Sequence, residues 1–147
     1  MIAVFQGPAA TADKHANLVK MLQMAVAASA ASARLVVFPE LFLSGYNISA
    51  DQMGDIAEPL DGPSIIAAQD IARNNNIGLL FGFPERADDK IFNSAALVNS
   101  KGEICHVYRK VQLFGAIEPT IFSRGTKFEV VEFPPFRIGV VICYDIE

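Results

Sequence analysis

The sequence predicts an α/β fold, because short apolar, strand-like runs alternate with helix-like segments in the first half of the chain. Apolar runs at residues 2–6 and 35–38 flank a long segment of helical composition. A second helix and strand follow at residues 63–72 and 77–83, and from residue 91 onward only strand-like segments appear. These observations predict an opening strand-helix-strand unit, a second alternation and a strand-rich second half.

Breaker and capping residues place the elements of the first half. A Gly-Pro pair closes the first strand, and Thr11 or Asp13 caps a helix that continues to about residue 33. That helix shows three apolar side chains on one face, those of Leu18, Leu22 and Val26. Pro39 bounds the run at residues 35–38, so we predict a buried strand there rather than another helical turn. Pro63 suits the first turn of the second helix.

The second half of the chain is predicted to form four strands, at residues 92–98, 104–109, 128–133 and 138–143. Turn-forming residues separate them, at residues 99–102 in the first pair and at Pro134-Pro135 in the second. The chain ends at Glu147, and two helices cannot cover both faces of so many apolar strands. We therefore expect further chain or a partner to cover one face of the sheet.

Composition bounds the class of protein. The 147 residues suit one domain or part of one, and we treat residues 1–147 as a single truncated domain. Hydrophobic residues make up 52%, which is far from a disordered composition. The net charge is −4 and the Lys and Arg residues are scattered, which argues against a nucleic-acid partner. Neither a signal sequence nor a membrane span is evident, so we expect a cytoplasmic protein without a membrane partner.

The chain has two cysteines, Cys105 and Cys143, and their spacing fits neither a zinc site nor a disulfide framework. Cys143 ends an apolar run, and a free cysteine in that setting is most often a small core residue. The alternative is a nucleophile elbow, in which a turn after the strand lifts the sulfur to the sheet edge beside an oxyanion-binding N–H. Local sequence alone leaves both interpretations open.

Three charged residues are further candidates. Glu40 follows a buried strand, at the kind of strand end where α/β folds gather their sites, but a solvated loop acid fits equally well. Lys110 closes another strand and is most often a surface charge there. A lysine beside a thiol and a carboxylate would instead favour the thiolate and stabilise an oxyanion. Glu118 lies in a loop, where a solvated acid is the usual interpretation.

Three segments, taken in order, resemble the signature segments of the nitrilase superfamily of carbon-nitrogen hydrolases. They are FPELFLSGY at residues 38–46, YRKVQLFG at 108–115 and GVVICYD at 139–145. Residues 3–6 and 93–95 also look like this family, so the resemblance spans essentially the whole chain. It implies the N-terminal half of a four-layer αββα sandwich, truncated after the nucleophile turn, because family members continue for about as much chain again.

The resemblance implies roles for five residues. Glu40 would be the general base, Lys110 the oxyanion-stabilising cation and Cys143 the nucleophile, which forms a thioester with loss of ammonia. Glu118 falls where amidase members place a second glutamate that positions the substrate and supports this triad. Tyr144 is a further supporting or substrate-positioning candidate. The resemblance implies no metal or organic cofactor, a small-molecule amide substrate and a homo-oligomeric full-length form.

Within the superfamily, residues 45–48, 82–86 and 143–147 are most similar to bacterial aliphatic amidases of the 5-aminopentanamidase and R-stereoselective amidase type. Gln112 departs from this pattern, because such relatives commonly carry His after the lysine. We expect hydrolysis of a small linear amide to a carboxylic acid and ammonia, weak or absent in this chain alone. A non-catalytic truncated paralogue that acts as an interaction module is the alternative.

Overall fold

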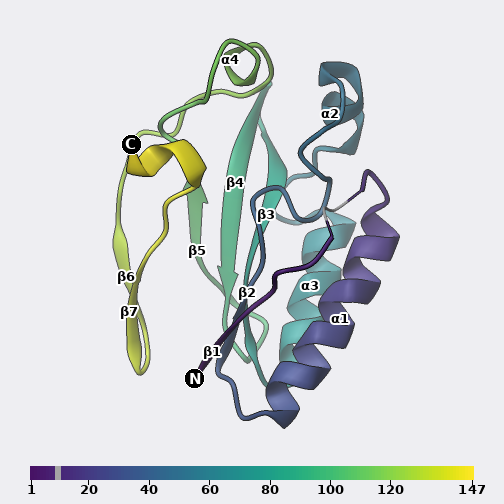
Figure 1. Cartoon of the computed structure of the whole chain (residues 1–147), viewed down its shortest axis with the longest axis vertical. Coiled ribbons are helices and arrows are strands. Elements are labelled where there is room, and N and C mark those ends of the chain that lie inside the picture. Colours follow the sequence, from purple (N-terminus) through teal and green to yellow (C-terminus); the bar gives the residue numbers. More distant parts are fainter. Residues whose placement is uncertain (9–10) are drawn as a thin grey trace.

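The computed structural model describes residues 1–8 and 11–147, and it arranges them in three layers (Figure 1). The middle layer is a five-stranded sheet of order β1-β2-β3-β4-β5. Helices α1 (Lys14–Ala30) and α3 (Pro63–Asn74) cover one face, and a hairpin of β6 (Val130–Phe133) and β7 (Phe136–Gly139) lies over the other. The predicted α/β fold is confirmed. The hairpin covers part of the sheet face that we expected to stay open within this chain.

The topology of the sheet places the ends of several strands close together, at one end of the sheet. β1 (Ile2–Val4), β2 (Leu35–Val37) and β3 (Gly78–Ala87) pair in parallel. β4 (Lys90–Val98) pairs antiparallel with both β3 and β5 (Ile104–Arg109). Parallel neighbours need long crossovers, which the helical segments supply, whereas tight turns join the antiparallel strands. The segments that follow β2 and β5 therefore lie near the beginning of β4, at the same end of the sheet.

The core divides along the alternation of side chains in the strands. Val36, Leu79 and Phe81 face the helices and belong to the large apolar cluster beneath α1 and α3. Leu35 and Leu97 face the opposite way and pack against Phe133 of the hairpin. Both faces of the central sheet are thus occupied by apolar contacts, which explains its continuous apolar strands.

The buried face of α1 only partly matches the apolar stripe noted in the sequence, of which Leu18 packs against the core. Leu22 and Val26 are 43% and 50% exposed. The buried residues are Asn17, Met21, Ala25 and Ala28. The two alanines of this face let α1 lie close to α3, which buries Ala68 and Ala72 in the same cluster, so close packing outweighs side-chain apolarity. The helix ends at Ala30, and no helix of the described residues is long and apolar enough to cross a membrane.

Three features of the chain were not predicted. Helix α2 (Ala50–Ile56) begins with a capping box between Ser49 and Gln52, which is a readable signal that the sequence analysis overlooked. The single turn α4 (Glu118–Ile121) was predicted as loop. The last two strands were misplaced: the predictions were residues 128–133 and 138–143, whereas the pairing of Val130 with Gly139 and of Phe133 with Phe136 limits β6 to Val130–Phe133 and β7 to Phe136–Gly139.

Candidate active site

Lys110 is the centre of the candidate site, and the fold buries it completely. Its backbone N–H donates to the Asn93 carbonyl at 2.9 Å, which extends the pairing of β5 and β4 by one residue. The side chain is 0% exposed, and Nζ donates to Glu40 Oε1 at 2.7 Å and to Glu118 Oε1 at 2.9 Å. The structure therefore brings Glu40, Lys110 and Glu118 together from three separate segments.

The two carboxylates keep this buried amine protonated. Burial by itself acts to lower the pKa of Lys110, because desolvation disfavours the charged form. Hydrogen bonds to Glu40 and Glu118 and the charges of both carboxylates act in the opposite direction and prevail, so the pKa of Lys110 is raised. An ammonium in this state can donate hydrogen bonds and stabilise negative charge, but it cannot serve as a base.

Glu40 is held by one of its two oxygens. Asn93 Nδ2 and Lys110 Nζ both donate to Oε1, each at 2.7 Å, and the side chain is 20% exposed. Oε2 accepts no hydrogen bond from the residues that the structure describes. This arrangement fixes the orientation of the carboxylate and leaves one oxygen available for proton transfer. Asn93 was not among the predicted site residues.

Cys143 lies at a sharp turn between an extended segment and a short helix. Its φ is +49°, an uncommon value for a residue with a side chain, and it begins the 3₁₀ helix η1 (Cys143–Ile146). The preceding residue, Ile142, is extended. Cys143 is exposed, and it lines a cavity of about 170 Å³ together with Glu40. The turn matches the geometry of a nucleophile elbow, although β7 itself ends earlier than predicted.

Glu118 is buried and is the second carboxylate that binds the Lys110 ammonium. Its Oε1 accepts from Lys110 Nζ and from the Tyr46 hydroxyl at 2.8 Å, and its Oε2 accepts from the Phe114 N–H at 2.6 Å. Burial, the hydrogen bond to Glu118 and the negative charges of Glu118 and Glu40 raise the pKa of Tyr46. Tyr46 therefore remains a neutral hydrogen-bond donor facing the site.

Two aromatic residues border the site. Tyr144 packs edge-to-face on Phe114, with ring centroids 5.4 Å apart, so the residue after Cys143 contacts the loop that leads to Glu118. Phe114 also lines an apolar cavity of about 490 Å³, together with Tyr46 and Ile117. This cavity adjoins Glu118 and offers apolar surface next to the charged cluster. The supporting role predicted for Tyr144 stays a prediction.

Asp145 was also missed as a site residue, although it lies in one of the three signature segments. Its carboxylate accepts hydrogen bonds from the Tyr108 hydroxyl and from the backbone N–H groups of Val111, Gln112 and Ile142. No local sequence signal announces these contacts, because three of the four donors lie more than 30 residues away in the chain.

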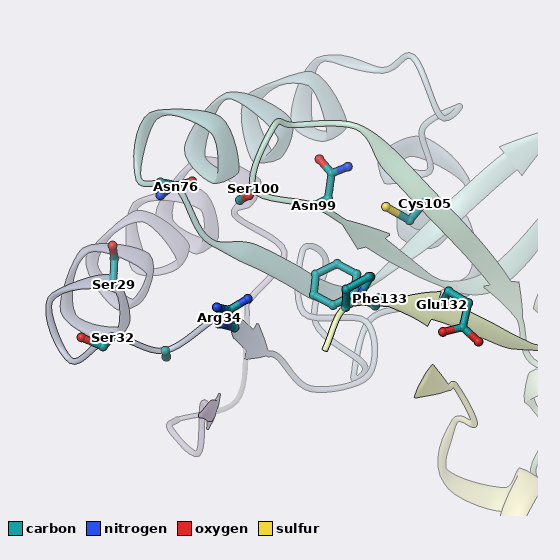
Figure 2. A pocket seen from close by; sticks show the side chains of 11 residues that line it. Ser29, Ser32, Arg34, Asn76, Asn99, Ser100, Cys105, Glu132 and Phe133 are labelled. Atoms are coloured by element: carbon teal, nitrogen blue, oxygen red, sulfur yellow. The ribbon is translucent and has the colours of Figure 1, made fainter. Parts of the chain in front are cut away.

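A third, larger cavity lies away from these residues. Figure 2 shows it between the end of α1, the turn that joins β4 to β5, and the end of β6; its volume is about 580 Å³. Cys105 lines this cavity, but none of the five predicted site residues does. Its thiol makes one hydrogen bond among the described residues, to the Glu103 carbonyl at 3.7 Å. Cys105 is therefore a natural reference thiol for Cys143.

A protein family described as carbon-nitrogen hydrolase matches the whole chain, residues 1–147. The chain belongs to the carbon-nitrogen hydrolase family. It is 40% identical over 99% of its length to a protein of Pseudomonas protegens named "Hydrolase in pqqF 5'region". It is 36% identical over 92% of its length to an (R)-stereoselective amidase from a Pseudomonas species. The chain spans about half the length of both relatives, 51% and 48%.

Solved structures agree with this membership of the carbon-nitrogen hydrolase family. An amidase from Nesterenkonia sp. superposes with a TM-score of 0.83 at 29% identity, over 99% of this chain and 56% of the amidase chain. A cysteine-to-alanine variant of that amidase is in complex with butyramide. A glutamate-to-glutamine variant carries acrylamide, added by Michael addition, at the active-site cysteine. The predicted family is therefore confirmed.

Proposed function

We propose that this chain carries the catalytic residues of a hydrolase that converts a small aliphatic amide to a carboxylic acid and ammonia through a thioester on Cys143. One observation carries the proposal: a buried ammonium, that of Lys110, lies between two carboxylates next to a cavity shared by Glu40 and Cys143. A thiol, a base and a fixed cation are the groups that thiol-dependent amide hydrolysis requires.

In the first half of the reaction, Glu40 removes the thiol proton while the sulfur of Cys143 attacks the amide carbonyl carbon. The Lys110 ammonium and the backbone N–H of Tyr144 stabilise the oxyanion of the tetrahedral intermediate. Glu40 then delivers its proton to the nitrogen, the carbon-nitrogen bond breaks and ammonia leaves. The acyl group remains on the sulfur as a thioester.

In the second half, Glu40 takes a proton from water, and the resulting hydroxide attacks the thioester carbonyl. The carbon-sulfur bond breaks, the sulfur regains a proton and the carboxylic acid is released. Glu118 takes no proton in this scheme, because its oxygens are occupied by Lys110, Tyr46 and the Phe114 N–H. Its contribution is to hold the ammonium in place and position the substrate.

An aliphatic acyl chain is favoured by the apolar cavity beside Glu118, with Phe114 and Ile117 in its lining. Butyramide bound to the similar Nesterenkonia amidase supports a substrate of this size. Turnover by this chain alone is expected to be weak or absent, because Cys143 is exposed and a reactive geometry depends on a surrounding shell. A homo-oligomeric full-length form would supply more of that shell.

Two measurements on matched variants test the proposal. Iodoacetamide labelling at neutral pH should modify Cys143 faster than Cys105, although both thiols are exposed, because Cys143 shares a cavity with Glu40, the carboxylate bound to the Lys110 ammonium. Ammonia release from butyramide, where detectable, should disappear in Cys143→Ala and persist in Cys105→Ala. Equal labelling rates for the two thiols in the wild-type chain would contradict the proposal.

A non-catalytic interaction module is the second candidate function. Exposed apolar side chains on α1 favour it, namely Val19, Leu22 and Val26, at 42%, 43% and 50% exposure. Such side chains on one helix are typical of contact with another protein surface. This alternative predicts a stoichiometric complex that Leu22→Lys disrupts, together with no preferential labelling of Cys143.

A further inference from the structure

The Asp145 carboxylate joins two segments of the site that are distant in sequence. Its Oδ2 accepts from the Ile142 N–H at 2.9 Å and from the Tyr108 hydroxyl at 2.7 Å. Its Oδ1 accepts from the N–H groups of Val111 and Gln112, at 3.1 Å and 2.8 Å. Ile142 directly precedes Cys143, and Val111 and Gln112 directly follow Lys110. One side chain therefore connects the backbone next to the cysteine with the backbone next to the lysine.

The backbone of Cys143 needs such support. A positive φ is energetically unfavourable for a residue with a side chain, and it persists only where the surroundings impose it. The bond from Ile142 fixes the peptide immediately before this turn, and Asp145 itself lies within η1. Asp145 therefore hydrogen-bonds both to the residue before Cys143 within this turn and to the segment after Lys110.

The same contacts argue against a proton-transfer role for Asp145. Each of its oxygens already accepts two hydrogen bonds, which uses the lone pairs of an ionised carboxylate. Tyr108 is buried, and its burial, its hydrogen bond to Asp145 and the Asp145 charge raise the pKa of its hydroxyl. Tyr108 therefore stays a neutral donor to this carboxylate. A carboxylate whose oxygens are all engaged in hydrogen bonds is suited to holding the backbone in place and not to proton transfer.

We propose that Asp145 is a positioning residue, which sets the location of Cys143 relative to Lys110 and Glu40 by hydrogen-bonding the backbone on both sides. This role rests on the proposed function, because it matters only where the thiol is the reacting group. It assigns to the signature segment around Cys143 a second task besides supplying the nucleophile.

The test compares alkylation of the two thiols by iodoacetamide in one chain at neutral pH, with peptide mapping. Asp145→Ala removes all four acceptor contacts, and Asp145→Asn keeps one acceptor oxygen. Asp89→Asn is the matched control, because Asp89 is exposed in the turn between β3 and β4. We expect the rate ratio of Cys143 to Cys105 to fall about ten- to hundredfold in Asp145→Ala, less in Asp145→Asn, and to stay unchanged in the control.

The sign of the change separates positioning from simple electrostatics. Loss of a negative charge near Cys143 would by itself favour the thiolate and speed alkylation, whereas displacement from Lys110 slows it. A merely structural role would lower the thermal midpoint without a selective loss of Cys143 labelling at temperatures where the variant stays folded. Tyr108→Phe provides a milder variant that removes one donor, and it should reduce the ratio by a smaller factor with the fold retained.

The possible results are distinguishable. If the wild-type chain labels Cys143 no faster than Cys105, the proposed thiol chemistry and the role of Asp145 are both overturned. If the wild-type chain shows the preference and Asp145→Asn and Asp145→Ala keep it in full, the positioning role is wrong while the proposed function stands. A graded loss of the ratio from wild type through Asn to Ala, with Cys105 unchanged, supports the role.

Discussion

The Nζ atom of Lys110 lies 2.7 Å from Oε1 of Glu40, although 70 residues separate the two in the sequence. The pair forms only when β2 and β5 end at the same end of the sheet. Because Glu118 accepts a hydrogen bond from a second N–H of the ammonium, two carboxylates compensate the buried cation. The integrity of this cluster is therefore a measure of whether the site is assembled.

Lys110→Met should be strongly destabilising. The substitution leaves Glu40 and Glu118 facing each other without their cation, and removing one partner of a buried ion pair costs roughly 3–5 kcal/mol. Urea unfolding at neutral pH measures this change in the free energy of unfolding. Lys101→Met, at an exposed turn position, should change it by less than about 0.5 kcal/mol. Equal effects of the two substitutions would contradict the buried network.

Tyr46→Phe should weaken the same cluster without a change of shape. The substitution removes the hydroxyl that donates to Glu118 Oε1 at 2.8 Å. We expect a loss of about 0.5–1.5 kcal/mol in the free energy of unfolding, together with slower iodoacetamide labelling of Cys143. Tyr144→Phe is the control for stability, because its ring packing on Phe114 is retained. An unchanged labelling rate in Tyr46→Phe would show that Tyr46 does not support the site.

Gly82→Ala should displace the segment that carries Glu40. A Cβ at Gly82 would overlap the backbone nitrogen of Leu41 and lie 2.9 Å from the Glu40 carbonyl carbon, so the backbone must move. Such overpacking typically costs about 1–3 kcal/mol, and slower labelling of Cys143 should accompany it. Gly54→Ala is the matched control, because a Cβ there meets nothing within 4 Å and alanine favours the helix. Normal labelling in Gly82→Ala would mean that this segment adapts freely.

Glu58 should make the stability of the fold depend on pH in the acid range. Burial acts to raise the pKa of Glu58, but hydrogen bonds from Lys14 and Ser64 and the Lys14 charge prevail and lower it below 4.5. A lowered pKa in the folded state means that the unfolded chain binds the proton more tightly. The stabilisation of the fold by ionised Glu58 is therefore complete above pH 4.5, and it is lost as the pH falls through the pKa of Glu58 in the folded state.

Glu58→Gln should remove this contribution. Urea unfolding of the variant, followed from neutral pH downward, should show a smaller decrease in the free energy of unfolding below pH 4.5 than the wild type shows. Glu103→Gln, at an exposed position, serves as the control for the loss of one carboxylate. Parallel curves for wild type and Glu58→Gln would refute the assigned cause.

Much of the fold was predictable because the relevant signals are local. The breaks at Pro39 and Pro63 placed a strand end and a helix start close to their observed positions, and the turn at residues 99–102 placed both neighbouring strands. Of the apolar stripe noted on α1, only Leu18 packs against the core, because contact with α3 and not apolarity alone selects the buried face. The position of the last strand was also wrong, because pairing with β6 places β7 at Phe136–Gly139 instead of residues 138–143.

By itself, the sequence determined the α/β class, the family and the candidate residues Glu40, Lys110, Glu118 and Cys143, because each lies in or beside a recognisable segment. It did not reveal the connections among them. Asn93, Tyr46 and Asp145 entered the site only through hydrogen bonds to partners distant in the chain. Such contacts depend on strand order and on the close approach of segments, which side-chain identity along one chain does not encode locally. The residue types were thus readable from the sequence, and the tertiary structure decided which of them meet.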